Sequence, residues 1–287
     1  MMKKFTSILS LLPALLLLAS CSGALLSAQP GSQSDQAQVV DANANEPFSY
    51  KPYAEVLDAY VNEQGFVDYQ GLQANRQRLD QFNASLTAVD SATYDSWTEA
   101  EQMALWINAY NSLTLKSIID ESPIKDSIKD IVGVWRIKQH AVLADGKTLT
   151  LNNIEHDVLR ADFNEPRIHV AINCASFSCP DLRMEVYTGD KLDAQLDEQV
   201  RRFLSNPKGL RIDREADIVY LSKIFEWFGE DWTPSYGVDS GFTGNQNERA
   251  VLNFISGYLE ADDQAYLAEG NYRVKYIDYD WSLNVQS

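Results

Sequence analysis

Residues 167–180, Arg-Ile-His-Val-Ala-Ile-Asn-Cys-Ala-Ser-Phe-Ser-Cys-Pro, combine a short apolar run with a dense group of reactive side chains. The apolar first half predicts a buried strand, and the small polar residues after it predict a loop. The segment holds His169, one of three histidines in the chain, together with Cys174 and Cys179, two of its three cysteines. Any chemistry of the protein is therefore expected to centre on this strand and loop.

The composition is that of a globular protein with an acidic surface. Hydrophobic residues make up 45% of the 287 residues and aromatic residues 11%, which is enough to bury a sizeable core. The formal net charge of −17 disfavours binding to nucleic acid and to anionic lipid, because both are negatively charged. Nucleic acid is therefore not expected among the partners.

The first twenty residues predict a targeting segment rather than part of the fold. Lys3 and Lys4 precede an apolar run at 8–18, which is shorter than the ~20 residues of a membrane-spanning helix. The run ends in Leu-Ala-Ser-Cys21, which resembles the lipobox of bacterial lipoproteins. We expect cleavage of residues 1–20 as a signal peptide, acylation of Cys21, and a lipid anchor in the membrane of a bacterial cell envelope. The alternative is an ordinary cleaved signal peptide with a chance cysteine.

Residues 21–46 are expected to link this anchor to the folded part. They are rich in Ser, Gln, Ala, Asp and Asn, a composition typical of a flexible tether. By analogy with lipoprotein sorting, the serine after Cys21 suggests the outer membrane and its periplasmic face. Outside the cytoplasm, neighbouring cysteines can form a lasting disulfide. The folded domain is expected at residues 47–287.

The folded part has no internal repeat and no break in composition. Thr98 and Glu101 have capping-box spacing, and the apolar residues after them predict a helix over 99–120. Asp145 and Gly146 predict a hairpin turn. The other expected elements are helices at 53–61, 72–89, 152–160, 190–206 and 248–259 and strands at 66–69, 132–137, 139–143, 148–151, 217–221 and 274–280. This order predicts a single α+β domain with an antiparallel or mixed sheet flanked by helices.

Polar side chains from other segments are candidates to meet the cysteine loop. Asn108 and Asn111 lie three residues apart on one surface of the predicted long helix. They either satisfy core backbone groups or orient a catalytic side chain, because an unpaired buried amide costs about 1–3 kcal/mol. Glu155 has the spacing of a cap partner for Asn152, and His156 beside it is either a surface residue or a site residue.

Four interpretations of Cys174 and Cys179 are open. Three of them are a disulfide, a metal site and a dithiol redox pair. A disulfide would shape the loop rather than drive folding, since closing so short a loop contributes about 2 kcal/mol. A metal site with His156 and His169 would have 12, 4 and 4 residues between successive ligands, which matches no standard zinc spacing. Dithiol redox exchange usually has two residues between its cysteines, and this pair has four.

In the fourth interpretation, Cys174 is a catalytic nucleophile. A nucleophilic thiol needs a base or a cationic neighbour, and the base needs an orienting group. His156 and His169 are the candidate bases, although strand alternation places His169 and Cys174 on opposite faces. Backbone N–H groups of residues 175–178 are expected to stabilise an oxyanion. The candidate orienting residues are Asn108, Asn111, Asn173 and Glu155.

Five short motifs lie between residues 106 and 284, and the resemblance that they carry spans most of residues 50–284. They are Trp-Ile-Asn108-Ala-Tyr110-Asn111, Ile-Glu155-His156-Asp-Val-Leu-Arg160, His169-Val-Ala-Ile-Asn173-Cys174-Ala-Ser-Phe-Ser178-Cys179-Pro, Leu-Ser-Lys223-Ile-Phe and Tyr279-Asp-Trp-Ser-Leu-Asn. Together these motifs resemble the domain of unknown function 547 (DUF547) family. The family has no assigned activity, so the resemblance implies one domain and one cluster of residues but no mechanism. It also occurs in intracellular proteins, and reducing compartments would not keep a purely structural disulfide.

The sequence thus predicts a lipid-anchored envelope protein that is a candidate Cys/His-dependent hydrolase or acyl-transferase. Its substrate would be a small molecule, a peptide or an acyl compound with an amide or ester bond. No cofactor and no metal are expected, and the sequence does not indicate an oligomeric state. The alternative is a non-catalytic binding or scaffold lipoprotein with a disulfide-shaped recognition loop. Besides the candidate catalytic residues, the expected site-lining residues are Tyr110, Asn111, Arg160, Ser178 and Cys179.

Overall fold

A computed structural model describes residues 48–286, and the structural statements below refer to these residues. The expected signal peptide, Cys21 and the tether at 21–46 lie outside them, so processing and lipidation remain predictions. Within the described residues, no helix is long and apolar enough to cross a membrane.

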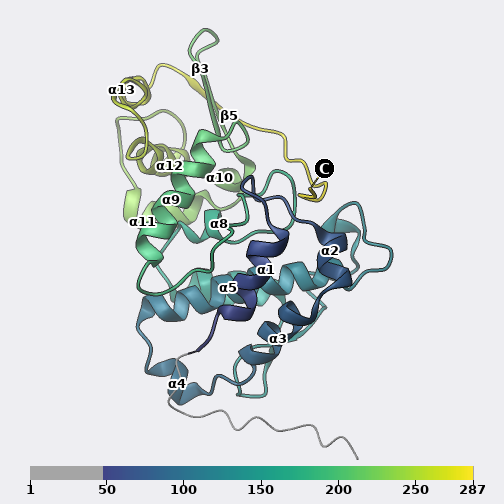
Figure 1. Cartoon of the computed structure of the whole chain (residues 1–287). Helices are drawn as coiled ribbons and strands as arrows, with labels where there is room; N and C mark the ends of the chain where they lie inside the picture. Colours follow the sequence, from purple (N-terminus) through teal and green to yellow (C-terminus); the bar gives the residue numbers. More distant parts are fainter. Residues whose placement is uncertain (1–47, 287) are drawn as a thin grey trace, which may run out of the picture. The chain divides into compact units, whose positions relative to one another are not determined.

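The first half of the described chain is helical and is built around one long buried helix, α5 (Glu99–Ile119). Its capping box forms as predicted: the Thr98 N–H donates to Glu101 Oε2 at 2.8 Å, and the Glu101 N–H donates to Thr98 Oγ1 at 3.3 Å. The preceding helices are α1 (Lys51–Tyr60), α2 (Tyr69–Ala74), α3 (Gln77–Leu86) and α4 (Ser91–Asp95). Of these, α2 and α3 lie beside α5 (Figure 1).

Two predictions in this half are wrong in their extent. The helix predicted at 72–89 is divided into α2 and α3 by a turn at 75–76. The strand predicted at 66–69 is reduced to single bridges at Val67, because Asp68 accepts a hydrogen bond from the Gly71 N–H and caps α2.

The predicted hairpin forms in a shortened version. β1 (His140–Ala141) pairs with β2 (Thr148–Leu149) in an antiparallel arrangement around the turn at Asp145 and Gly146. It is followed by α6 (Leu151–Asn153), a π-helical turn η2 (Ile154–Leu159) and α7 (Arg160–Asp162), which together form one continuous helical segment.

The strand predicted at 132–137 is wrong, because this segment is a tight turn that follows η1 (Ile128–Asp130). The N–H groups of Ile137 and Lys138 both donate to the Gly133 carbonyl. Gly133 has a φ of +69°, which a residue without a Cβ adopts at little cost. The turn places its side chains at the candidate site described below.

The central strand predicted at the start of 167–180 is also wrong. Residues Ile168–Ala171 form a short helix, α8, in which the His169 N–H donates to the Pro166 carbonyl and the Val170 N–H to the Arg167 carbonyl. A short apolar run fits a buried helical turn as well as a strand, and periodicity alone does not separate the two. The strand alternation that would place His169 and Cys174 on opposite faces therefore does not apply.

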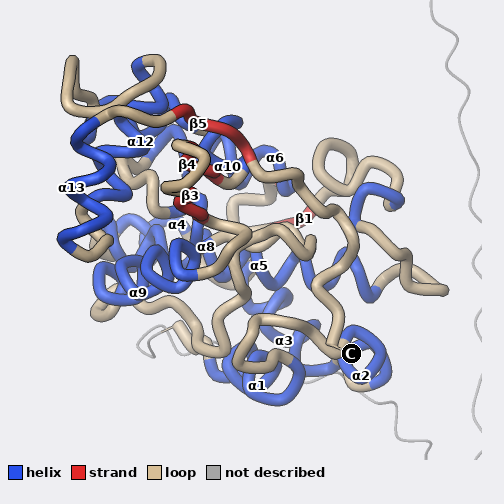
Figure 2. Tube along the Cα trace, turned by 90° about the horizontal axis from the view of Figure 1, so that it is seen from above, coloured by secondary structure: helices blue, strands red, loops and turns tan. Residues whose placement is uncertain are grey.

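The second half of the described chain contains a three-stranded mixed sheet. β3 (Leu210–Asp213) is antiparallel to β4 (Ile218–Leu221), and β4 is parallel to β5 (Arg273–Tyr276). The strands predicted near β4 and β5 are confirmed, while β3 has no counterpart among the predictions. The sheet lies among helices (Figure 2). These are α9 (Leu192–Ser205), α10 (Lys223–Trp227), η3 (Gly229–Trp232), α11 (Thr233–Tyr236), α12 (Gln246–Ser256) and α13 (Ala261–Glu269).

The predicted α+β fold class is confirmed, and its apolar interior has two parts. One core forms around α5, and the other forms around α12 and the sheet. α8 lies between them, because Ile168 and Ala171 belong to the first core and Val170 to the second. The residues that follow α8 are thus held at the boundary of the two cores.

Candidate functional site

A pocket of about 250 Å³ lies at this boundary. It is lined by residues from α5, η2, α8, α10, the cysteine loop and the segment after β5. The structure therefore brings together side chains that are far apart in the sequence. Six of the predicted site residues line it: Tyr110, Glu155, His156, His169, Cys174 and Cys179.

Cys174 faces three hydrogen-bonding groups at the pocket. Its Sγ lies 3.0 Å from Cys179 Sγ, 3.1 Å from Ser176 Oγ and 3.3 Å from Tyr279 Oη. Hydrogen bonds from Cys179, Ser176 and Tyr279 hold the pKa of Cys174 below that of an ordinary thiol, although burial opposes this shift. Burial and the neighbouring Cys174 raise the pKa of Cys179, which therefore stays a thiol and donates. The arrangement stabilises Cys174 as a thiolate.

The disulfide of the structural interpretation is not formed. Both cysteines are free, and their sulfurs are 3.0 Å apart, compared with about 2.05 Å in a disulfide bond. The Cys174 N–H also donates to Cys179 Sγ at 3.0 Å. Cys179 thus acts in this structure as a hydrogen-bonding neighbour of Cys174.

Two asparagines fix the backbone on either side of Cys174. Asn111 Oδ1 accepts from the Asn173 N–H at 2.7 Å. Asn173 in turn accepts from the Ala175 N–H at 2.8 Å and donates to the Pro180 carbonyl at 2.7 Å. Ala175 has a φ of +59°, a strained value for a residue with a Cβ. These amides therefore position the thiol, and the prediction that Asn173 or Asn111 orients a histidine is wrong.

The prediction that Asn108 orients a catalytic base is also wrong. Asn108 Nδ2 donates to the Tyr187 carbonyl at 2.7 Å, and its Oδ1 accepts from the Tyr187 N–H at 3.1 Å. Asn108 is buried and does not line the pocket. Asn108 instead satisfies core backbone groups, which was the other alternative for this residue in the sequence analysis.

Three of the four loop N–H groups expected to form an oxyanion hole are bonded elsewhere. The Ala175 N–H donates to Asn173, and those of Phe177 and Ser178 donate to the carbonyls of Ser282 and Asp280. Ser178 Oγ accepts from the Asp280 N–H at 2.9 Å, so Ser178 anchors the C-terminal segment rather than lining the pocket. The fourth, the Ser176 N–H, is directed at Cys174 and helps to lower the pKa of its thiol. Side chains at the pocket are the other candidate donors for an oxyanion.

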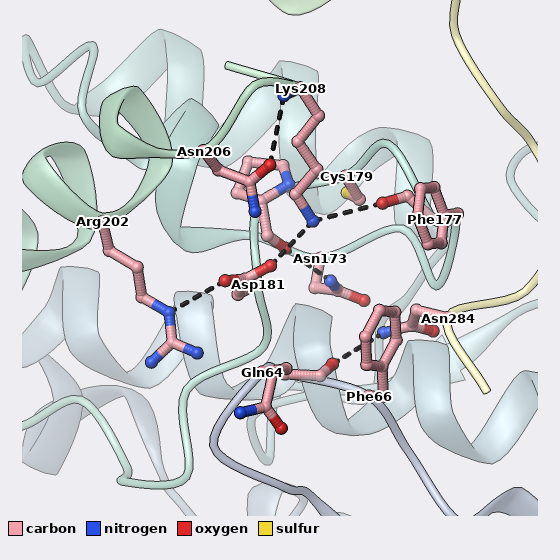
Figure 3. Close-up of polar contacts among 12 residues, drawn as sticks. Gln64, Phe66, Asn173, Phe177, Cys179, Asp181, Arg202, Asn206, Lys208 and Asn284 are labelled. Atoms are coloured by element: carbon pink, nitrogen blue, oxygen red, sulfur yellow. Dashed lines mark hydrogen bonds and ion pairs between the residues drawn. The ribbon is translucent and has the colours of Figure 1, made fainter. Parts of the chain in front are cut away.

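A further set of contacts holds the loop from residues that do not line the pocket (Figure 3). Lys208 Nζ donates to the Phe177 carbonyl at 3.1 Å and to Asp181 Oδ1 at 2.7 Å. Arg202 Nε donates to Asp181 Oδ2 at 2.9 Å. Arg202 lies on α9 and Lys208 follows this helix. These contacts therefore hold the loop against the second half of the domain.

Glu155 projects into the pocket instead of capping a helix. The capping box that forms joins Thr150 and Asn153, so the predicted pairing of Glu155 with Asn152 is wrong. Tyr110 Oη donates to Glu155 Oε2 at 3.1 Å. Burial raises the pKa of Glu155 to about 7, so this carboxyl exchanges a proton near neutral pH. π-helical turns such as η2 are rare in proteins, and those that do occur often lie at functional sites.

His156 is held by Arg160. Arg160 Nη1 lies 2.8 Å from His156 Nδ1, and its Nε and Nη2 donate to Asp231 at 2.6 and 2.8 Å. Because a guanidinium only donates, His156 Nδ1 accepts, and the proton of the neutral ring is on Nε2. Burial, with the positive charge of Arg160, lowers the pKa of His156. At neutral pH the His156 ring is therefore neutral and carries its one N–H on Nε2.

His169 is held by the same carboxylate. Its Nε2 lies 2.7 Å from Asp231 Oδ2, so Nε2–H donates and Nδ1 keeps a lone pair. The ring is buried and stacks on Phe228 with centroids 4.2 Å apart. Burial lowers the pKa of His169, so the ring is neutral at neutral pH. No hydrogen bond joins Cys174 to His156 or His169 in the described structure, which differs from the expected direct Cys–His pair.

Residues 94–204 match the family model described as Protein of unknown function, DUF547. The chain is a DUF547-like protein. The match includes three of the five motifs on which the predicted resemblance rests, and with them Tyr110, Glu155, His156, His169 and Cys174. The motifs at 221–225 and 279–284 lie beyond it, so the match is shorter than the predicted resemblance over 50–284. No curated protein and no solved structure gives a significant match to the chain.

The DUF547-like stretch does not contain the whole pocket. An aromatic wall is formed by Trp135, Trp227, Tyr279 and Trp281, and three of these residues follow residue 204. The rings of Tyr279 and Trp281 lie 4.6 Å apart, and the Trp227 ring lies 5.7 Å from that of Trp281. The predictions did not include this wall as part of the site.

Proposed function

We propose that this DUF547-like protein is a cysteine-dependent hydrolase or acyl-transferase that acts on amide or ester bonds. The observation that carries the proposal is the set of hydrogen bonds on Cys174 Sγ at a pocket that also contains Glu155, His156 and His169. A thiol with a lowered pKa is a thiolate at neutral pH and is a strong nucleophile for carbonyl carbon.

In the first half of the reaction, Cys174 Sγ attacks the carbonyl carbon of the substrate. As the new carbon–sulfur bond forms, the carbonyl electron pair moves to oxygen and gives an oxyanion. When the carbonyl forms again, the carbon–oxygen or carbon–nitrogen bond of the leaving group breaks. Glu155, with a pKa of about 7, gives its proton to the leaving group. The Nε2–H of His156 and the side-chain amide of Asn152, which also line the pocket, are the donors for the transient oxyanion.

In the second half, water or an acceptor alcohol or amine attacks the thioester. Glu155, now a carboxylate, removes the proton of the acceptor, and the Cys174 thiolate leaves. His169 is the alternative base, because Asp231 holds its Nε2–H and leaves the Nδ1 lone pair free. Arg160 donates to Nδ1 of His156, so the neutral His156 ring has no free lone pair with which to accept a proton. Glu155 and His169 are therefore the proposed bases in place of His156.

The kinetics of p-nitrophenyl ester hydrolysis test this proposal. We expect a burst of nitrophenol followed by slower turnover in the native protein, and the loss of both in Cys174→Ala. Cys179→Ala should keep the burst but need a higher pH, because it removes one donor to the thiolate. Turnover that is undiminished in Cys174→Ala would contradict the role of Cys174 as the nucleophile. No burst and no turnover in the native protein would contradict the proposal and favour a non-catalytic binding protein.

The proposed location is the cell envelope, with a lipid anchor at Cys21. This part of the proposal is supported by the Leu-Ala-Ser-Cys21 motif and the apolar run before it. Growth with an alkyne analogue of palmitate should label the native protein and not Cys21→Ala. Equal labelling of the two proteins, or none in either, would contradict the anchor.

A further inference from the structure

We infer that the substrate of this pocket carries an anionic group, a carboxylate or a phosphate, which Arg136 binds at the pocket opening. The acyl part of the same substrate would pack on the aromatic wall and reach Cys174. The inference depends on the proposed function for the chemistry at Cys174, whereas the binding of an anion by Arg136 is tested separately below.

Arg136 has the position of a binding residue. It lines the pocket and yet is exposed, which places it where the pocket opens to solvent. After burial and Arg160, its positive charge also contributes to the lowered pKa of His156, which lines the same pocket. The turn that carries it is fixed, because the Asn152 N–H donates to the Trp135 carbonyl at 2.9 Å.

Arg136 also has unused binding capacity. Among residues 48–286 its guanidinium has no carboxylate within 4.0 Å and makes no side-chain hydrogen bond, whereas the nearby Arg160 binds both Asp231 and Glu230. A guanidinium presents donors in a planar fork that matches a carboxylate or a phosphate. The chain has 41 acidic and 24 basic residues, so most cations have carboxylates available to pair with. Arg136 stands at the pocket opening without such a partner among the described residues.

A second positive charge lies at the aromatic wall. Lys129 Nζ lies 5.0 Å from the centroid of the Trp281 ring, so a second positive charge already occupies a face of the aromatic wall. Glu155 is largely uncharged below its pKa of about 7. An aromatic wall alone would suit a quaternary ammonium ligand, but Lys129 and Arg136 would repel it.

Two alkylating reagents with the same leaving group and different charge test the inference. The rate of alkylation of Cys174 is measured with iodoacetate, which is anionic, and with iodoacetamide, which is neutral. We expect Arg136→Gln to lower the ratio of the iodoacetate rate to the iodoacetamide rate by about threefold or more, because a charge that attracts the anion is lost. The iodoacetamide rate itself should change little.

Arg201→Gln is the matched control, since Arg201 lies on α9, is exposed, and does not line the pocket. It removes the same net charge and should leave the rate ratio unchanged. An unchanged ratio in Arg136→Gln, or an equal fall in both variants, would overturn the inference. If Cys174 reacts no faster than a free thiol with either reagent, the proposed function fails instead.

Protection experiments distinguish the two anionic groups. Benzoate and phenyl phosphate each join an aromatic ring to an anion, and each is tested for slowing the reaction of iodoacetamide with Cys174. Protection by either compound that disappears in Arg136→Gln supports the inference and identifies the preferred anion. Protection that survives in Arg136→Gln, or protection by neither compound, contradicts it.

Discussion

Removal of the hydroxyl of Tyr279 should raise the pKa of Cys174. Tyr279 Oη lies 3.3 Å from Cys174 Sγ, and it remains protonated because burial and the neighbouring thiols raise its own pKa. A hydrogen bond to a charged group contributes about 1.5–3 kcal/mol, and water entering the pocket would restore part of that. We therefore expect Tyr279→Phe to raise the pKa of Cys174 by about one unit, which corresponds to about 1.4 kcal/mol.

Ser176→Ala should have a smaller effect on the same pKa. Ser176 Oγ lies 3.1 Å from Cys174 Sγ and also 2.9 Å from Tyr279 Oη, so its proton is shared between two acceptors. We expect a rise of about half a unit. The double variant should give less than the sum of the two single changes, because the two hydroxyls belong to one network.

The assay is the rate of iodoacetamide alkylation of Cys174 between pH 5 and 10, with the modified peptide identified by mass spectrometry. The rate rises with pH as the thiolate forms, so a higher pKa moves the midpoint upward and slows the reaction at pH 7. Tyr276→Phe is the matched control, because its hydroxyl donates to Glu248. A midpoint in Tyr279→Phe that equals that of the native protein would refute the reasoning.

Three further predictions concern other residues of the domain. Asn108→Ala should lower the free energy of unfolding in urea by about 2–3 kcal/mol, because two backbone groups of Tyr187 lose their partner; a loss below 0.5 kcal/mol would contradict this. Burial raises the pKa of Glu155 to about 7, so it contributes stability that is lost as pH rises from about 4.5 to 7. Glu155→Gln should remove about 3 kcal/mol of that pH dependence, and an unchanged pH profile of unfolding would contradict the assignment. Arg160→Gln should remove the donor that keeps the proton of His156 on Nε2, so ¹⁵N NMR spectra should show a mixture of the two neutral tautomers. Unchanged ¹⁵N shifts would contradict the assigned role of Arg160.

The elements that the sequence predicted well are those with local signals. The helix after Thr98 and the hairpin at Asp145 and Gly146 are encoded within a few residues, by a capping box and a turn dipeptide. The position of the pocket was also predicted from a local signal, because His169, Cys174 and Cys179 lie within one short segment. Local patterns failed for α8, whose short apolar run is shared by two cores and fits a helix as well as a strand.

The partners of the site residues are set by contacts between distant segments. Asp231 is 62 residues from His169, and Tyr279 is 105 residues from Cys174. Neither has a local spacing that points to its partner, although Tyr279 begins one of the motifs that resemble DUF547. The roles of Asn108 and Asn173 likewise depend on which backbone groups the fold brings to them, which residue type alone does not specify.

The covalent intermediate gives the most direct test of the account. The protein is incubated with p-nitrophenyl butyrate, quenched in acid and digested, and its peptides are mapped by mass spectrometry. We predict a butyryl group on Cys174 that appears within the burst and decays with turnover, while Cys179 stays unmodified. Butyryl groups on Cys179 or on surface lysines only, with Cys174 unmodified, would contradict the claim that Cys174 is the nucleophile.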